Sequence, residues 1–140
     1  MTLRRIAVYH NTDSRFFPYE PGHALTQVVS HQRHLPPETS PEDIADWAYH
    51  LFNADLDHLQ SNRGETDNGE MDFLLASTYR LLGLRSLSAG DVIAITSEDT
   101  TTFLACEFTG WRHIDTPDNR TGQGLTAATV YQHLSRGNHA

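Results

Sequence analysis

Apolar side chains recur with a period of two in several short segments, which is the spacing of β-strands. In the first segment Ile6 and Val8 point to one side of an extended backbone, and Ala7 and Tyr9 point to the other. The third segment is preceded by Gly90-Asp91, a pair that favours a turn. We therefore predict four strands, over residues 4–9, 24–30, 91–96 and 102–108, with a turn at residues 97–100.

Apolar spacings of three and four residues predict helices between and after these strands. Ser40 is a typical N-cap, Pro41 suits the first helical position, and Asp43 places a carboxylate in the first turn. This helix should end near residue 53, because its apolar positions share one stripe: Ile44, Trp47, Ala48, Leu51 and Phe52. Two further helices are predicted, over residues 70–82 and 126–134.

Together these elements predict an α+β fold: a small antiparallel sheet of about four strands, two helices packed on one face, and a short C-terminal helix. The length of 140 residues suits one such core. We expect the α+β core domain to span residues 1–114. Residues 115–140 are predicted to be a polar, glycine-bearing linker followed by the C-terminal helix.

Charge is unevenly distributed along the chain, whose formal net charge is −8. Residues 41–82 carry nine acidic side chains and two arginines, a net charge of −7. Such a balance disfavours nonspecific binding of nucleic acid, which needs clustered basic residues. All ten basic residues are arginine, and the absence of lysine excludes a Walker-type phosphate loop, a Schiff base and a lysine general base.

Cysteine usage and the apolar runs indicate a cytoplasmic location. Cys106 is the only cysteine, so no internal disulfide can form, which suits a reducing compartment. No apolar run approaches the roughly 20 residues that a membrane helix requires, so we expect no membrane association. The first residues also lack the apolar stretch of a signal peptide.

The densest group of polar and aromatic side chains follows the first predicted strand. It combines acid–base groups with an arginine that could hold a carboxylate or phosphate. If the chain is an enzyme, we expect its site here, with Ser86 or Ser88 contributing from across the sheet. The alternative is a hydrogen-bonded turn over residues 11–14, with Arg15 paired to nearby acids. The candidate ligand- or partner-binding residues are Tyr9, His10, Asn11, Asp13, Arg15, Tyr19, His23, Ser86, Ser88 and Trp111.

Nine histidines invite a metal-site hypothesis. His31 and His34 have the spacing of two ligands within one helical turn, and Cys106 is a further potential ligand. A structural zinc site, however, usually has four ligands in recognisable pairs. Pro36-Pro37 also makes a helix that presents both rings on one side unfavourable. We therefore predict ordinary histidines, with no metal and no cofactor.

Two motifs stand out from the rest of the chain: YHNTDSRFF at Tyr9–Phe17, and RSLSAGDVI at Arg85–Ile93. With Tyr19–Leu25 and Gly110-Trp111, they resemble a family of small actinobacterial proteins of uncharacterised activity. The chain is more distantly similar to the YodL-like domains of conjugative elements and phages. The resemblance covers about residues 4–113. It implies an association with actinobacterial plasmids, phages and chromosomes, and no particular activity.

These observations lead to three functional hypotheses. The leading one is a cytoplasmic, non-enzymatic accessory or interaction protein of actinobacterial or mobile-element type, with a protein partner that contacts the acidic segment 41–82 and the C-terminal helix. The second is a nucleic-acid-associated module that binds RNA or single-stranded DNA through Arg15, its aromatic neighbours and Arg112, although the net charge disfavours it. The third is a small enzyme with a site around His10 and Arg15. The oligomeric state stays open.

Overall fold

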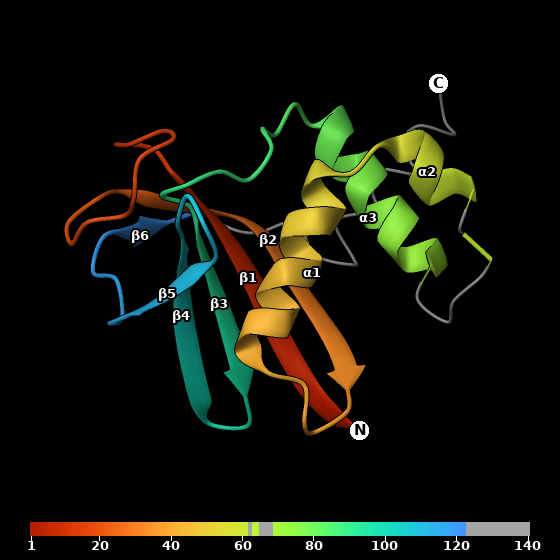
Figure 1. Cartoon of the computed structure of the whole chain (residues 1–140), viewed down its shortest axis with the longest axis horizontal. Coiled ribbons are helices and arrows are strands. Elements are labelled where there is room, and N and C mark those ends of the chain that lie inside the picture. The colour runs from red at the N-terminus through yellow and green to blue at the C-terminus, as the bar shows by residue number, and fades with distance from the viewer. Residues whose placement is uncertain (62, 65–68, 123–140) are drawn as a thin grey trace.

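Six strands form one mixed β-sheet in the computed structural model of the chain, which describes residues 1–61, 63–64 and 69–122 (Figure 1). The order of the strands across the sheet is β5-β4-β3-β1-β2-β6. All neighbours are antiparallel except β2 and β6, which are parallel. The strands are β1 (Thr2–Asn11), β2 (Leu25–Leu35), β3 (Val92–Ser97), β4 (Thr100–Cys106), β5 (Trp111–Ile114) and β6 (Arg120–Thr121).

β1 lies inside the sheet because it pairs with β3 on one side and with β2 on the other. Ile6 stands opposite Ile95, and Val8 stands opposite Ile93, so the β-branched side chains of the two strands form one continuous apolar face. Glu98, with a φ of 56°, lies in the turn between β3 and β4. The four predicted strands are present with shifted ends, and the predicted pairing of the hairpin with the first strand is confirmed.

β2 is longer than the sequence pattern predicts, because it continues to Leu35. A bulge at Val28 shifts the register between β1 and β2. Beyond the bulge, His31 and Arg33 lie on the face of the sheet that the helices cover, where both are buried. Polar side chains at buried positions interrupt the apolar alternation, and this concealed the second half of the strand.

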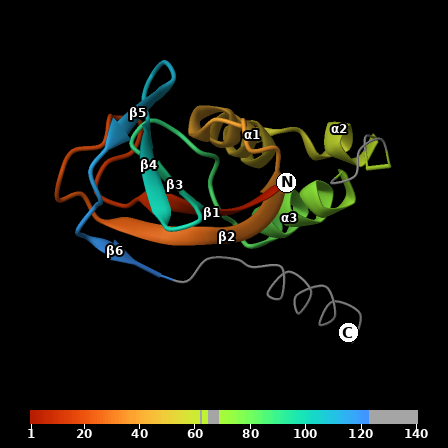
Figure 2. The same cartoon turned by 90° about the horizontal axis from the view of Figure 1, so that it is seen from below.

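Helices α1 and α3 pack on one face of the sheet (Figures 1 and 2). α1 (Pro41–Asn53) begins after Ser40, whose Oγ accepts a hydrogen bond from the Asp43 N–H at 3.1 Å. α1 matches its predicted range. α3 (Gly69–Leu81) differs from its predicted range, residues 70–82, by one residue at each end. The short α2 (Leu56–Ser61) is not predicted and carries no buried residue. Among the described helices, none combines the length and apolar character needed to span a bilayer.

The main core lies between the sheet and these helices. Phe52 of α1 and Tyr79 of α3 are fully buried, and the centroids of their rings lie 4.6 Å apart. Burial of one such aromatic side chain contributes about 2–3 kcal/mol to stability. The strands supply the floor of this core through Ile6, Val8, Val29, Ile93, Ile95 and Leu104.

A smaller core lies on the opposite face of the sheet. The side chains that form it come from four strands and from the segment between β1 and β2. They are Tyr9, Tyr19, Leu25, Val92, Ala94, Phe103 and Ala105. β6 borders this core and pairs with β2 at Leu25 and Thr26. The sheet therefore has apolar side chains on both faces, and the helices of the described residues cover one of them.

The α+β class is confirmed, and the predicted details are corrected. The described residues form six strands and three helices where about four strands and two helices were predicted, and the β2–β6 pair is parallel rather than antiparallel. Residues 120–121, predicted to belong to a linker, form β6 because their backbone pairs with the edge of β2. The domain boundary at residue 114 stays a prediction, and the predicted helix at 126–134 lies outside the described residues.

Candidate functional site

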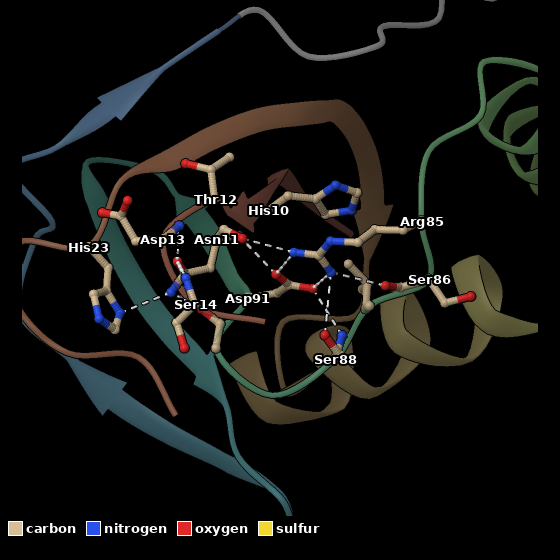
Figure 3. A network of polar contacts seen from close by, with 12 residues as sticks. His10, Asn11, Thr12, Asp13, Ser14, His23, Arg85, Ser86, Ser88 and Asp91 are labelled. Carbon is tan, nitrogen blue, oxygen red and sulfur yellow. Dashed lines mark hydrogen bonds and ion pairs between the residues drawn. The ribbon is translucent and has the colours of Figure 1, made fainter. Parts of the chain in front are cut away.

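An ion pair between half-buried Arg85 and buried Asp91 organises the polar residues at the end of β1 (Figure 3). Arg85 Nη1 and Nη2 donate to Asp91 Oδ2 and Oδ1, each at 2.7 Å, in a bidentate arrangement. The Asp91 carboxylate also accepts hydrogen bonds from the backbone N–H groups of Asn11 and Ser88, both at 2.9 Å. These four hydrogen bonds use the accepting capacity of the carboxylate and join β1 to the segment before β3.

Asn11, which is also buried, connects this ion pair to the loop that follows β1. Its Nδ2 donates to the Gly90 carbonyl and to His23 Nδ1, both at 3.1 Å. Its Oδ1 accepts hydrogen bonds from the N–H groups of Asp13 and Ser14, at 3.0 and 2.8 Å. All four hydrogen-bonding positions of the amide are occupied, and together they fix its orientation. The hydrogen-bonded turn predicted here is therefore present.

His10 points to the helix side of the sheet, and its Nε2 lies 2.6 Å from the Tyr79 hydroxyl oxygen. That hydroxyl has one hydrogen and donates it to the Arg85 carbonyl, so His10 Nε2 carries the hydrogen of the neutral ring. Burial lowers the pKa of His10 from 6.5 to about 4, although nearby Asp91 opposes the shift. Burial also raises the pKa of Tyr79. Neither side chain titrates near neutral pH, so the pair is a fixed structural contact.

The segment between β1 and β2, residues 12–24, is called the aromatic loop below, and several contacts hold it in place. Asp13 Oδ2 accepts a hydrogen bond from the Ala24 N–H at 2.7 Å, which ties the two ends of the loop together. Tyr19 is buried in the smaller core, and its carbonyl accepts a hydrogen bond from Arg112 Nη2 at 2.6 Å. The loop is therefore anchored at its ends and near its middle.

Two phenylalanines of the aromatic loop remain exposed, Phe16 at 60% and Phe17 at 66% of their surface. Phe16 has a φ of 71°, a left-handed conformation that costs a residue with a Cβ about 1–2 kcal/mol. The Phe17 carbonyl packs so closely against Gly90 that a Cβ at this glycine would lie 2.4 Å from its oxygen. The exposed aromatic pair is thus held on a backbone with little room to move.

The structure brings together most of the candidate residues that the sequence indicated (Figure 3). Ser88 Oγ accepts a hydrogen bond from Arg85 at 3.3 Å, whereas the neighbouring Ser86 offers only its carbonyl, at 3.2 Å, and is exposed. Tyr19 of the aromatic loop lies beside the network, because its ring centroid is 5.8 Å from that of His23. Asp13 joins the network through its backbone N–H, which donates to Asn11 Oδ1. The candidates that belong to the network through their side chains are His10, Asn11, His23 and Ser88.

Three candidate residues lie apart from this network. Tyr9 lies on the opposite face of the sheet, where its hydroxyl accepts a hydrogen bond from Gln27 Nε2 at 3.1 Å. Arg15 is exposed and lies 5.5 Å from the centroid of the Phe16 ring, and the predicted ion pair with a nearby acid does not form among the described residues. Trp111 lies on β5, half-buried against α1, where it lines a hollow of about 240 Å³.

Arg85 and Tyr79 are central to the network but are absent from the candidates that the sequence indicates, and for Asp91 the sequence predicts only a place in a local turn. The turn is present, since Asp91 accepts the Ser88 N–H. Opposite charges on either side of a small, glycine-bearing segment were the signal that could have found the ion pair. Tyr79 carried no comparable signal, because a tyrosine on the buried stripe of a helix is usually part of the core.

His31 and His34 lie on opposite faces of β2, because side chains three positions apart in a strand point in opposite directions. His31 is buried and stacks on Trp47, with ring centroids 5.8 Å apart. Burial, with the adjacent Arg33 charge, lowers its pKa to about 4. In the part of the chain that the structure describes, no three His, Cys, Asp or Glu side chains are grouped to hold a metal ion.

The sequence matches no protein-family model and no curated protein, and the fold matches no solved structure. What the site can do therefore follows from its geometry. The carboxylate of Asp91 and the amide of Asn11 bond to groups of the protein itself. Burial raises the pKa of the Cys106 thiol to about 12, so it is not a nucleophile near neutral pH. The network supports the loop beside it.

We expect the fold to lose stability between pH 7.5 and pH 5 because of His10 and His31. Both rings are neutral in the folded chain, where their pKa is about 4, whereas the ordinary pKa of an unfolded histidine is 6.5. Below pH 6.5 the unfolded chain binds protons that the folded chain does not, which favours unfolding until the pH nears 4. Each ring should lower the free energy of unfolding by about 2 kcal/mol at pH 5. Urea denaturation at pH 7.5, 6 and 5 measures this.

Substitution by glutamine removes the titrating ring and keeps a side-chain N–H donor. The double variant His10→Gln/His31→Gln should lose most of the pH dependence in this range. The control is His50→Gln, because His50 lies at an exposed position of α1. This variant should keep the pH dependence of the wild type. The same pH dependence in the double variant and the wild type would show that other groups cause it.

Proposed function

We propose that this chain is a non-enzymatic interaction protein, and that its protein partner contacts the aromatic loop. The observation that carries this proposal is the exposure of Phe16 and Phe17 on a loop that the buried network holds in one position. Aromatic side chains are enriched in interface cores, and an ordered loop lowers the entropic cost of association. Backbone strain at Phe16 adds support, because strained residues tend to occur where function requires them.

The state of the polar side chains supports binding rather than catalysis. A general base must reach a substrate proton, directly or through one water molecule. His10 is buried, neutral and hydrogen-bonded to Tyr79, and Asp91 is paired with Arg85 and two backbone N–H groups. Arg15 lies at the surface over the Phe16 ring rather than beside His10. These contacts argue against the small-enzyme hypothesis.

Nucleic-acid binding has one favourable feature, the exposed stack of Arg15 on Phe16. Arg112, the second arginine of that hypothesis, donates to the Glu107 carboxylate at 2.9 Å and to the Tyr19 carbonyl. The chain carries a net charge of −8, which repels a phosphate backbone. A protein partner therefore fits the surface better, and an RNA and single-stranded DNA gel-shift assay at low salt is a separate check.

The biological setting is a proposal based on the resemblance of the two motifs to actinobacterial proteins. We propose that the chain acts in the cytoplasm, as an accessory protein of a plasmid, a phage or a chromosomal region derived from one. Gene neighbourhood tests this setting. Genes for conjugation, phage or toxin–antitoxin functions beside this one would support it, and a setting among unrelated metabolic genes would count against it.

Replacement of both exposed phenylalanines should remove partner binding without unfolding the chain. Truncation of an aromatic residue at the centre of an interface costs about 2 kcal/mol or more, roughly thirtyfold in affinity. Phe16→Ala/Phe17→Ala removes only exposed side chains, so its melting temperature should remain close to that of the wild type. The measurement is capture of proteins from a lysate of the native host on the immobilised full chain.

The matched control is Leu81→Ala, because Leu81 is 81% exposed at the end of α3. We expect the wild type and Leu81→Ala to retain the same protein and the double variant to lose it. Equal retention by all three chains, or no specific protein retained by the wild type, would overturn the proposal.

A further inference from the structure

The face of the sheet opposite the helices contains a hollow of about 390 Å³. This volume lies within the range of small-molecule sites, about 300–1,000 Å³. Residues of β1, β2, β3 and β4 line it, together with Thr116 from the segment before β6 and Arg120 of β6 itself. The hollow lies outside the network of Figure 3, because it is on the other side of the sheet from His10.

Small side chains in the middle of the sheet create the hollow. Ala7 stands opposite Ala94, which stands opposite Phe103, so this row across β1, β3 and β4 contains two alanines. The next row on the same face is Arg5, Thr96 and Thr101, and its side chains are longer or more polar. Because a methyl group fills little space, the alanines leave a depression bordered by larger neighbours.

Two guanidinium groups border this depression. The Arg120 guanidinium lies 5.2 Å from the centroid of the Phe103 ring, directly at the alanine row. Arg5 lies on β1 two residues from Ala7, a separation of about 7 Å along a strand. Both arginines are exposed, and neither has an acidic partner among the described residues.

The charge of the hollow is opposite to the charge of the chain. The described residues that line it include two arginines and no aspartate or glutamate, whereas the chain has a net charge of −8. Hydroxyl groups complete the lining, from Tyr9, Ser30, Thr96, Thr101 and Thr116. The Tyr9 hydroxyl accepts a hydrogen bond from Gln27, so its own hydrogen can be donated to another group.

We propose that this hollow binds a small organic anion whose phosphate or carboxylate group contacts Arg5 and Arg120 and whose hydroxyl groups contact the threonines and Ser30. Guanidinium groups form charge-assisted hydrogen bonds with both kinds of oxygen anion. The proposal stands apart from the aromatic loop, because no residue of that loop lines the hollow.

The test is a titration of the isotopically labelled full chain at low salt, followed by backbone amide NMR signals. The probes are ribose 5-phosphate, citrate and inorganic phosphate, of which the first two separate the phosphate and carboxylate sources. We expect saturable shifts at the amides of Arg5, Ala7, Ala94 and Thr96. Ribose 5-phosphate or citrate should bind at least about tenfold more tightly than inorganic phosphate, because the hydroxyl groups of the sugar phosphate, or the hydroxyl and additional carboxylates of citrate, add hydrogen bonds.

Arg5→Ala and Arg120→Ala should each weaken binding at least about tenfold, because each removes a charge-assisted hydrogen bond. The control is Arg63→Ala, which removes a half-buried arginine that lies between α2 and α3 and pairs with Glu70 of α3. Binding to Arg63→Ala should equal that of the wild type. Absence of saturable shifts with all three probes at 20 mM, or equal binding by Arg5→Ala, Arg120→Ala and the wild type, would overturn the proposal. The dispersion of the NMR spectrum shows whether each variant is folded.

Discussion

Asp91→Ala should destabilise the fold by about 3–5 kcal/mol, the largest loss that we expect from a single substitution. The Asp91 carboxylate accepts two hydrogen bonds from Arg85 and one each from the N–H groups of Asn11 and Ser88. Alanine would leave a partly buried guanidinium without its counter-charge and two N–H groups without an acceptor. Each such unsatisfied group costs about 1–3 kcal/mol. Urea denaturation at pH 7.5, followed by circular dichroism, measures the loss.

Matched variants separate the ion pair from the loss of a side chain. Asp91→Asn keeps the shape and one acceptor oxygen, so it should cost less, about 2 kcal/mol. Arg85→Ala should also cost less, because Asp91 retains its two backbone donors. The double variant Arg85→Ala/Asp91→Ala should cost less than the sum of the single variants, since it leaves no unpaired charge. Asp115→Ala, at an exposed position, is the control and should change stability by less than about 0.5 kcal/mol.

If Asp91→Ala and Asp115→Ala changed the free energy of unfolding equally, the network in Figure 3 would not explain the stability of the fold. A large loss in Asp91→Ala also has a functional consequence. Because Asn11 and Gly90 connect the ion pair to the aromatic loop, the loop should lose its fixed position in this variant. Partner capture should therefore fall even under conditions where most of the chain remains folded.

Gly90→Ala is the second large effect, and we expect it to cost about 3 kcal/mol. Gly90 has a φ of 98°, which a residue with a Cβ adopts only under strain. The added Cβ would also lie 2.4 Å from the Phe17 carbonyl oxygen, a backbone atom that cannot rotate away. The aromatic loop would have to move, and this movement disturbs the hydrogen bond from Asn11 Nδ2 to the Gly90 carbonyl.

Gly22→Ala is the matched control, because Gly22 has nearly the same φ, 94°, and no atom within 4 Å of an added Cβ. It should show only the conformational cost, about 1 kcal/mol. The difference between the two variants in urea denaturation isolates the contact with Phe17. Equal losses would mean that the close approach of the loop to Gly90 contributes nothing to stability.

The elements with a clear local pattern were predictable. The cap at Ser40 and the apolar stripe that follows it define α1, and the alternation at Ile6 and Val8 defines β1. The turn before β3 was predictable as well, because Gly90 and Asp91 have strong local preferences. In each case the residues that determine the structure are neighbours in the chain, so their spacing alone is informative.

The elements that the pattern missed depend on distant parts of the chain. The second half of β2 carries His31 and Arg33 on its buried face, where Trp47 of α1 and Asp72 of α3 contact them. β6 has only two residues, and it forms a strand because its backbone pairs with the edge of β2. Neither segment has an apolar alternation of its own, so neither could be recognised locally.

For the candidate site, the sequence showed that the residues after β1 are unusual, and it identified His10, Asn11 and Asp13 among them. It did not show that their role is to fix a loop, since the contact from Asn11 to Asp91 spans 80 positions. Nor could it show that Phe16 and Phe17 stay exposed, or that Ala7 and Ala94 meet beneath two arginines. Local hydrogen-bonding and apolar preferences act between residues that are close in the chain, so the sequence alone reveals them. Which distant side chains neutralise one another, and which are left facing solvent, is decided only when the strands pair.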